Sequence, residues 1–411
     1  MTNVTKVNGY DSNRVSVLDT SLRDGEQSPG FNMTSEQKMK MAHALAELRV
    51  DVIEAGFAAS SPSDFNSVQQ IANDIKGPTI CSLARASQGD IEASAKALKG
   101  ADKSRIHIFL ATSPIHREHK LGMTKAQVVE RARNRVKMAA ELADEVQFSP
   151  EDAGRTEMDF LVEVCSAVVD AGAKIINIPD TVGYVTPDEM YRKISMLKRE
   201  VTGIENCVIS VHCHNDLGLA VANSLAALQA GARQVDCTIN GIGERAGNAS
   251  LEEIVMALRT RQDAYGLYSD VDTTKLYGIS HLLSQLTGNE VPRNKAIVGR
   301  NAFAHEAGIH QHGVLNNKET YEIMKPENIG APASRLVLGK HSGRHALTDR
   351  LKNLGHAPVS AQFDHIFSEF KLLADRKHEV SDQDLEMLVK KSMVQTGEHK
   401  SHASQAIMAI Y

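Results

Sequence analysis

The stretch that decides the fold of this chain reads Cys207-Val208-Ile209-Ser210-Val211-His212-Cys213-His214-Asn215-Asp216. Its first half is apolar, which is typical of a buried β-strand. Side chains alternate across a strand, so His212 and His214 point to one face and Cys213 points to the other. Two imidazoles at the carboxyl end of a strand suit a metal ion. Taken alone, the pattern is explained equally well without a metal, as two polar histidines at the point where a strand leaves the core.

Similar short apolar runs recur along the first two thirds of the chain. The eight candidate strands are Val15–Ser21, Val50–Phe57, Thr79–Ala84, Arg105–Ala111, Glu145–Ser149, Lys174–Pro179, Val208–His214 and Gln234–Asn240. Segments of helical period lie between them, at Thr34–Leu48, Thr124–Ala143, Glu157–Ala171, Pro187–Val201, Asp216–Ala230 and Ser250–Arg261. This alternation over about 250 residues predicts an α/β fold, a (β/α)8 TIM barrel. An open doubly wound sheet is the alternative, but no Gly-x-Gly-x-x-Gly follows the first strand.

The alternation of strands and helices stops near residue 265. We therefore predict a catalytic barrel domain over 1–265 and a helix-rich appendage over 266–411. Gly278, Pro292 and Pro326 interrupt the helical segments of the appendage. The stretch Lys371–Lys391 is heavily charged, and we expect it to form a solvated surface helix.

Composition excludes several classes of partner. The chain has 411 residues, of which 42% are hydrophobic and 24% charged, with a net charge of -5. There is no basic-aromatic alternation, so we expect no nucleic acid as partner. No apolar run approaches the ~20 residues of a membrane span, so we expect no membrane either. The N-terminus lacks a signal-peptide core and the five cysteines are scattered, which favours a cytoplasmic protein with reduced thiols.

Polar residues gather where the predicted strands end, and this is the end of a barrel that carries its chemistry. They are Arg23, Asp24, Glu54, His107, Ser149, Glu151, Asn177, Thr181, His212, His214 and Asn248. Burying so many charges without mutual pairing is costly. A metal ion and an anionic substrate would neutralise them.

A metal site follows from three of these residues. Asp24, His212 and His214 offer one carboxylate oxygen and two nitrogens, a set suited to Mn, Zn, Fe or Mg with positions left for substrate. Asn248 could add an amide oxygen. Such a metal can hold a 2-oxo acid and polarise its carbonyl, and Arg23 could neutralise the alkoxide that develops there.

Plain structural interpretations stand beside these. Arg23 could form a salt bridge at the barrel mouth, and Glu151 and His107 could belong to a structural hydrogen-bond network. Arg155 could simply pair with Asp152.

Taken together, five motifs resemble the 2-isopropylmalate synthase family, the acyl-CoA-condensing branch of the metal-dependent TIM barrels that includes homocitrate and citramalate synthases. The motifs are Leu18-Asp19-Thr20-Ser21-Leu22-Arg23-Asp24-Gly25-Glu26-Gln27, Ser149-Pro150-Glu151-Asp152-Ala153-Gly154-Arg155-Thr156, Asn177-Ile178-Pro179-Asp180-Thr181-Val182-Gly183-Tyr184, Val211-His212-Cys213-His214-Asn215-Asp216-Leu217-Gly218 and Asn240-Gly241-Ile242-Gly243-Glu244-Arg245-Ala246-Gly247-Asn248. The resemblance extends from about residue 14 to about residue 390.

The resemblance implies a role for each site residue. The metal ligands would be Asp24, His212 and His214, with Asn248 nearby. The substrate contacts would be Arg23, His107, Ser149, Thr181 and Asn177, and the catalytic residues Arg23, Glu151 and His310. His310 belongs to the appendage motif Phe303-Ala304-His305-Glu306-Ala307-Gly308-Ile309-His310-Gln311 and would help to remove a methyl proton from acetyl-CoA. In the family this segment crosses to a neighbouring barrel, which implies a homodimer with an exchanged appendage.

The implied reaction is a Claisen-type condensation of acetyl-CoA with a 2-oxo acid, using a divalent metal (Mn2+, Mg2+ or Zn2+). The default acceptor is 3-methyl-2-oxobutanoate; pyruvate, 2-oxoglutarate and phosphonopyruvate are alternatives. A lyase of the same barrel superfamily is another alternative. Such lyases are expected to carry a cysteine in the strand-eight loop, which here reads Gly241-Ile242-Gly243.

The chain departs from the family pattern at three places. His312 stands where the family motif usually has Asp, and Ala58 stands where it usually has Pro. The sequence ends at Tyr411, whereas leucine-forming members carry a further regulatory domain. We therefore expect a short form without leucine regulation, and the imidazole of His312 would favour a more anionic acceptor such as phosphonopyruvate.

Overall fold

The computed structural model describes residues 6–7, 10–333, 335–377 and 379–392. They fall into two compact units, which are described separately. The first comprises Met1–Pro292, Ala296–Val298 and Ile329–Ala331, and the second comprises Arg293–Lys295, Gly299–Asn328 and Pro332–Tyr411.

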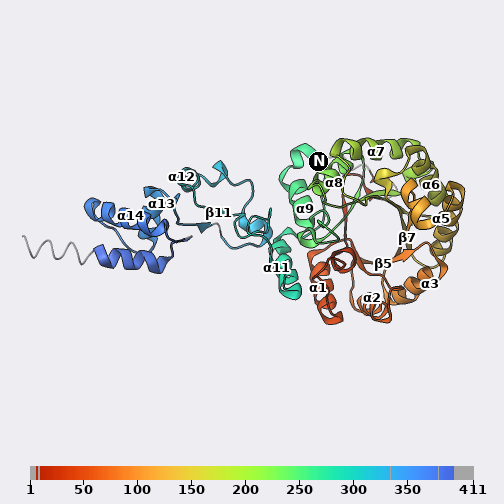
Figure 1. The fold of residues 1–411 in the computed structure, drawn as a ribbon, viewed down its shortest axis with the longest axis horizontal. Helices are drawn as coiled ribbons and strands as arrows, with labels where there is room; N and C mark the ends of the chain where they lie inside the picture. Colours follow the sequence, from red (N-terminus) through yellow and green to blue (C-terminus); the bar gives the residue numbers. More distant parts are fainter. Residues whose placement is uncertain (1–5, 8–9, 334, 378, 393–411) are drawn as a thin grey trace, which may run out of the picture. The chain divides into compact units, whose positions relative to one another are not determined.

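The first unit is built on a closed barrel of eight parallel strands (Figure 1). The strands are β3 (Ser16–Asp19), β4 (Val52–Gly56), β5 (Thr79–Arg85), β6 (Ser104–Ala111), β7 (Glu145–Glu151), β8 (Ile175–Asp180), β9 (Val208–Cys213) and β10 (Gln234–Cys237). They pair in chain order, and β10 closes the barrel against β3. The predicted (β/α)8 barrel is confirmed, and each of the eight predicted runs contributes one strand.

Helices surround the barrel, because each strand buries its outer face against them. They are α1 (Ser35–Leu48), α2 (Pro62–Asp74), α3 (Gln88–Ala97), α5 (Lys125–Ala140), α6 (Met158–Asp170), α7 (Pro187–Glu200), α8 (Ala220–Ala230) and α9 (Leu251–Thr260). Three of them begin with a capping box in which a threonine and the residue three positions on satisfy each other's backbone N–H, at Thr34, Thr124 and Thr186. Every helix in the described ranges is too short or too polar to cross a lipid bilayer.

The first unit continues beyond residue 265. After α10 (Gln262–Tyr265), helix α11 (Leu276–Thr287) packs on α1, and Gln37 Nε2 donates to the backbone oxygen of Leu286 at 2.8 Å. The compact first unit therefore runs to Pro292. A further short hairpin, β1 (Lys6–Val7) with β2 (Tyr10–Asp11), precedes the barrel.

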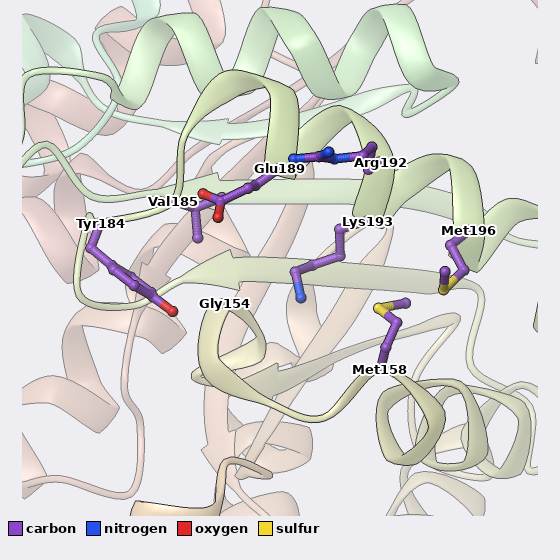
Figure 2. Close-up of a pocket in the computed structure, with 8 residues that line it drawn as sticks. All are labelled: Gly154, Met158, Tyr184, Val185, Glu189, Arg192, Lys193 and Met196. Carbon is purple, nitrogen blue, oxygen red and sulfur yellow. The ribbon is translucent and has the colours of Figure 1, made fainter.

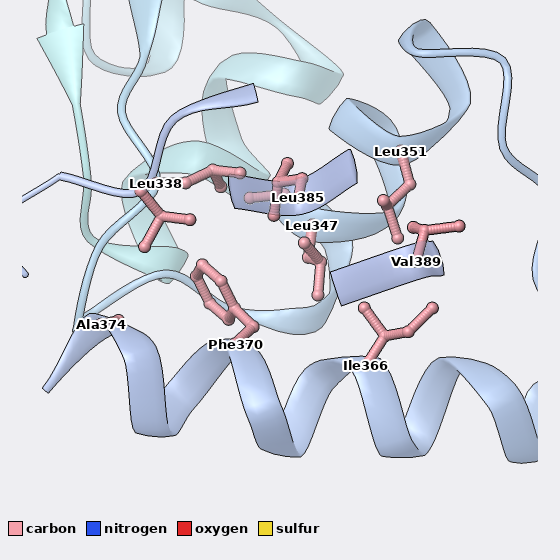
Figure 3. Close-up of a cluster of buried hydrophobic side chains, with 10 residues drawn as sticks. Leu338, Leu347, Leu351, Ile366, Phe370, Ala374, Leu385 and Val389 are labelled. Carbon is pink, nitrogen blue, oxygen red and sulfur yellow. The ribbon is translucent and has the colours of Figure 1, made fainter. Parts of the chain in front are cut away.

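The second unit joins a two-stranded sheet to a small helical core. Its elements are β11 (Ala304–His305), α12 (Gly308–Asn316), β12 (Arg335–Leu336), α13 (Arg344–Asn353), α14 (Ser360–Ala374) and a helix over 382–392. Strands β11 and β12 are parallel. Buried apolar side chains from α13, α14, the last helix and the segments beside them meet in one cluster (Figure 3): Leu338, Ala346, Leu347, Leu351, Ile366, Phe370, Ala374, Val380, Leu385 and Val389.

The expectation of one solvated helix over Lys371–Lys391 is wrong. Helix α14 ends at Ala374, and a second helix starts at 382 after a turn. The two helices bury Leu385 and Val389 in the apolar cluster. The high charge of this stretch suggested full exposure. Its apolar residues recur every three to four positions, which is the spacing of an amphipathic helix with one buried face.

Candidate active site

The loop after β3 brings Arg23 and Asp24 to the carboxyl end of the barrel. Residues Ser21–Gly25 form a short π-helix, a distortion that is frequent at functional sites. Thr20 caps it by accepting from the backbone N–H of Asp24 at 3.3 Å. The Arg23 guanidinium bonds Asp24 Oδ1 at 2.7 Å and Glu54 Oε2 at 2.6 Å.

Asp24 lies beside His212, which belongs to β9, and His214, which directly follows that strand. The candidate ligand atoms of Asp24, His212 and His214 all lie within 4.8 Å of one another, and all three side chains are buried. His212 Nε2 is 3.9 Å from Asp24 Oδ2 and 3.2 Å from His214 Nε2. Two donor atoms at right angles on one ion, each about 2.1 Å away, would be about 3 Å apart. The predicted trio is therefore brought together at a spacing that suits one metal ion.

The protonation states suit a cation. Burial lowers the pKa of His212 to about 3, with His214 adding to the effect, and burial also lowers the pKa of His214. Burial alone would raise the pKa of Asp24, but Arg23 and the two histidines outweigh it and hold this pKa at about 2. At neutral pH the trio thus presents two neutral imidazoles and one carboxylate, which are the forms that bind metals.

Asn248 joins this cluster from the loop after β10. Its Nδ2 donates to Asp24 Oδ2 at 2.5 Å and to the backbone oxygen of Ile242 at 3.0 Å. Its Oδ1 and Nδ1 of His214 are buried without a hydrogen-bond partner among the described residues. In this geometry Asn248 orients the Asp24 carboxylate, and its amide oxygen is not the atom that faces Asp24.

A continuous hydrogen-bond chain crosses the mouth of the barrel beside the candidate metal centre. Asn177 Nδ2 donates to Ser149 Oγ at 2.9 Å, and Ser149 Oγ lies 2.7 Å from His107 Nε2. His107 Nδ1 lies 2.6 Å from Glu54 Oε1, and Arg23 binds the other oxygen of Glu54. Because an ionised Glu54 only accepts, it accepts from Nδ1 of His107. Four of the five predicted substrate contacts, Asn177, Ser149, His107 and Arg23, are therefore linked to one another and to Asp24. Thr181 lies outside this chain.

Glu54 is the residue whose importance sequence reasoning missed. It is fully buried in β4, between Arg23 and His107. Burial would raise the pKa of this carboxyl, but Arg23 and His107 outweigh burial and hold the pKa well below its usual range. A charged residue inside a strand that is otherwise buried was the available signal.

Glu151 is the last residue of β7, and Thr181 directly follows β8. The Glu151 carboxylate is bound at both oxygens by Lys120 Nζ, at 2.7 and 2.9 Å. Thr181 Oγ1 accepts from the backbone N–H of Asp152 at 2.9 Å, so its own hydroxyl hydrogen is left to donate. Asp152 pairs with Arg155, as the plain interpretation of that residue predicts. No local sequence pattern predicts that Lys120 binds Glu151.

His310 lies in the second unit, on α12. Its ring is exposed and stacks on Tyr321 with centroids 4.2 Å apart, and it meets His305 edge to face at 6.4 Å. His305 Nε2 in turn lies 3.2 Å from Glu322 Oε1. His312 is exposed, near Asn316 and His345.

Two surface pockets lie on the first unit. One, of about 260 Å³, is lined by Gly154, Met158, Tyr184, Val185, Glu189, Arg192, Lys193 and Met196 (Figure 2). Burial lowers the pKa of Lys193, whose side chain extends from α7 into this hollow. The other, of about 230 Å³, adjoins the Gly241–Gly247 loop and is bordered by Ser28, Phe31, Leu283, Thr287 and residues 289–292. No predicted site residue lines either pocket.

Each of the two units matches a known family model. The model described as HMGL-like matches residues 14–283, and the model described as homocitrate synthase post-HMGL domain-like matches residues 297–378. The barrel with a carboxylate and two histidines at its mouth is thus that of the HMGL-like enzymes. A solved HMG-CoA lyase from Acinetobacter baumannii shares this fold, with a TM-score of 0.59 and 22% identity over 72% of this chain and 98% of that one.

Individual relatives narrow the class. The 2-isopropylmalate synthase of Aquifex aeolicus is 58% identical over 94% of this chain and 75% of its own length. That of Rhodopirellula baltica is 56% identical over 93% of this chain and 73% of its own length. The chain therefore belongs to the 2-isopropylmalate synthase family, as its motifs predict. It is an enzyme of the acyltransferase class.

Proposed function

We propose that the chain condenses acetyl-CoA with 3-methyl-2-oxobutanoate and releases 2-isopropylmalate and free CoA. Relatives that are 54–58% identical carry the name of that product, which supports this acceptor over pyruvate, 2-oxoglutarate and phosphonopyruvate. The observation that carries the proposal is the pairing of the candidate metal centre with the hydrogen-bond chain from Asn177 to Arg23. A 2-oxo acid presents a carboxylate and a ketone oxygen, and this arrangement offers a cation and directed donors for both.

Asp24, His212 and His214 are proposed to hold a divalent metal, with Asn248 orienting Asp24. When bound, the metal would supply Lewis-acid polarisation of the ketone. Arg23 would stabilise the negative charge that grows on the ketone oxygen during attack, because its guanidinium is fixed by Glu54 at 2.6 Å and cannot lose its proton. The side chains of Ser149, Asn177 and Thr181 would orient the acceptor, with His107 holding Ser149 in place.

Glu151 and His310 are proposed to handle the acetyl-CoA methyl proton. A carboxylate and an imidazole are the side chains most used for proton transfer near neutral pH. His310 is exposed, although its ring stacks on Tyr321, so a substrate can reach it. We propose that the chain forms a homodimer in which His310 of a second copy serves the barrel of the first. His310 in the second unit and Glu151 in the barrel would then belong to the same working site.

The test is a free-thiol assay with acetyl-CoA and 3-methyl-2-oxobutanoate, with the product identified by NMR. Wild-type enzyme with added metal should release CoA and form 2-isopropylmalate. Arg23→Lys should lose about 10²- to 10³-fold in kcat, because an ammonium cannot span Glu54 and Asp24 as the planar guanidinium does. Thiol release without 2-isopropylmalate, or an Arg23→Lys enzyme of wild-type rate, would refute the assignment.

A further inference from the structure

The backbone of Asp152 adopts a conformation that few non-glycine residues adopt. Its φ is 62° and its ψ is 38°, in the left-handed region. Non-glycine residues rarely adopt this region, because Cβ then approaches the carbonyl oxygen. Such strain persists only where surrounding contacts hold it, and it concentrates at functional sites. Asp152 directly follows Glu151 at the end of β7.

The side chain of Asp152 supplies the contacts that hold this conformation. It is fully buried. Arg155 Nε lies 2.9 Å from both carboxylate oxygens, and His116 Nδ1 lies 3.0 Å from Oδ2. His116 comes from the short helix Pro114–His116 in the loop after β6, and Ser113 Oγ lies 2.9 Å from its Nδ1. One carboxylate therefore ties the loop after β7 to the loop after β6.

The main chain of Asp152 reaches a third loop. Its N–H donates to Thr181 Oγ1 at 2.9 Å, after β8. Its carbonyl accepts from the Thr156 hydroxyl at 2.9 Å and from the Arg155 N–H at 3.1 Å. The position of the Thr181 hydroxyl thus depends on the same peptide that sets the direction of Glu151.

We propose that Asp152 is a positioning residue for the reaction. Its buried carboxylate, held by Arg155 and His116, locks a left-handed backbone turn that fixes the Glu151 carboxylate and the Thr181 hydroxyl relative to each other. The inference rests on the proposed function, because it assigns proton transfer to Glu151 and acceptor binding to Thr181. From the sequence, the Asp152–Arg155 pair was interpreted as a plain structural ion pair. In this proposal the same pair contributes to the reaction by fixing Glu151 and Thr181.

Two substitutions separate the charge from the backbone. Asp152→Asn keeps the volume and a residue type that tolerates the left-handed region, but it removes the charge that Arg155 binds. Asp152→Gly adopts that region freely and removes every side-chain contact. We expect kcat to fall at least tenfold in Asp152→Asn and further in Asp152→Gly. The KM for the 2-oxo acid should rise severalfold through Thr181, while the KM for acetyl-CoA stays within about twofold. A role in folding alone would reduce the active fraction and leave both KM values unchanged.

A double-mutant cycle tests whether Asp152 acts through Glu151. In a Glu151→Gln background, Asp152→Asn should reduce kcat by less than threefold, because the group that it positions is gone. A full tenfold loss in that background, or wild-type kcat and KM in folded Asp152→Asn, would overturn the proposal. If Glu151→Gln alone keeps wild-type kcat, the proposed role of Glu151 fails, and the 2-oxo acid KM of Asp152→Asn still decides whether Asp152 positions Thr181.

Two controls accompany the cycle. Arg49 also has a left-handed backbone, with φ 66°, but it lies at the end of α1, where the chain leads into the amino-terminal end of β4. Arg49→Gly should leave kcat and both KM values unchanged. If Asp152→Asn does not fold, Arg155→Gln at the more exposed end of the ion pair replaces it. It should show a smaller loss of kcat with the same rise in 2-oxo acid KM, and wild-type values for both would overturn the proposal.

Discussion

The Nε2 atoms of His212 and His214 face each other 3.2 Å apart at the end of β9. Burial keeps both rings neutral at neutral pH, since it lowers the pKa of each. Two lone pairs at this distance repel unless a proton or a cation lies between them. We propose that a divalent cation, held by both nitrogens and by Asp24, relieves this repulsion; a proton shared between the two rings is the alternative.

Removing this set should remove the metal. His212→Ala should bind the divalent ion at least tenfold more weakly and nearly abolish thiol release, and a chelator should do the same to the wild type. Metal content after dialysis and the rate of thiol release measure the two effects. His43→Ala, an exposed histidine on α1, is the control and should keep both. Full activity in a metal-stripped His212→Ala enzyme would refute the site.

His310 should matter for proton removal and not for acceptor binding. His310→Asn keeps a polar side chain on α12 but lacks a base. We expect exchange of the acetyl-CoA methyl protons with deuterated solvent to fall by about 10²-fold or more, while the affinity for the 2-oxo acid stays within about threefold of wild type. His345→Asn, another exposed histidine of the second unit, is the control. Unchanged exchange in His310→Asn would show that the base lies elsewhere.

The barrel could be predicted from the sequence because each strand is a short apolar run with a polar end. The helices were harder. Neither α2 nor α3 was predicted, since Ser, Asp, Asn and Gln dilute their apolar positions. Helix α8 begins at Ala220 and not at Asp216, because Arg245 binds the Asp216 carboxylate and Asn215 Oδ1 caps the N–H of Ala220. The presence or the first residue of these helices depends on contacts between residues that are distant in sequence.

Contacts between distant residues also decide which features of the site could be predicted. Strand alternation placed His212 and His214 together, and their sequence alone is enough for that. The contacts of Glu54 with His107 and of Lys120 with Glu151 join residues 53 and 31 positions apart. No local pattern encodes such pairs, so the sequence could name the polar residues but not their partners.

The apolar cluster of the second unit should carry much of its stability. Phe370 on α14 is fully buried, and Phe370→Ala should lower the free energy of unfolding by about 3–5 kcal/mol through lost transfer energy and a cavity. Leu372→Ala on the same helix removes a side chain that is 54% exposed, and it should change this free energy by about 0.5 kcal/mol or less. Urea denaturation measures both. Equal effects of the two substitutions would contradict the packing in Figure 3.

The start of the last helix should make stability depend on pH. Lys377 and Ser381 bind the Asp384 carboxylate and lower its pKa to about 2. Because this pKa is lower in the folded state, the contribution is complete above the unfolded value of about 4 and is lost as the pH falls toward about 2. Asp384→Asn should therefore cost about 1 kcal/mol at neutral pH and progressively less in acid. A cost that is the same at all pH values would contradict this.

The acceptor panel tests the central claim most directly. The assay compares kcat/KM for 3-methyl-2-oxobutanoate, pyruvate, 2-oxoglutarate and phosphonopyruvate, with acetyl-CoA and metal saturating. The account predicts that the branched acid is preferred by a hundredfold or more, about 2.7 kcal/mol in transition-state binding. A comparable or higher kcat/KM for phosphonopyruvate would contradict it and would bring His312 into acceptor selection. No thiol release with any 2-oxo acid would contradict the condensation itself.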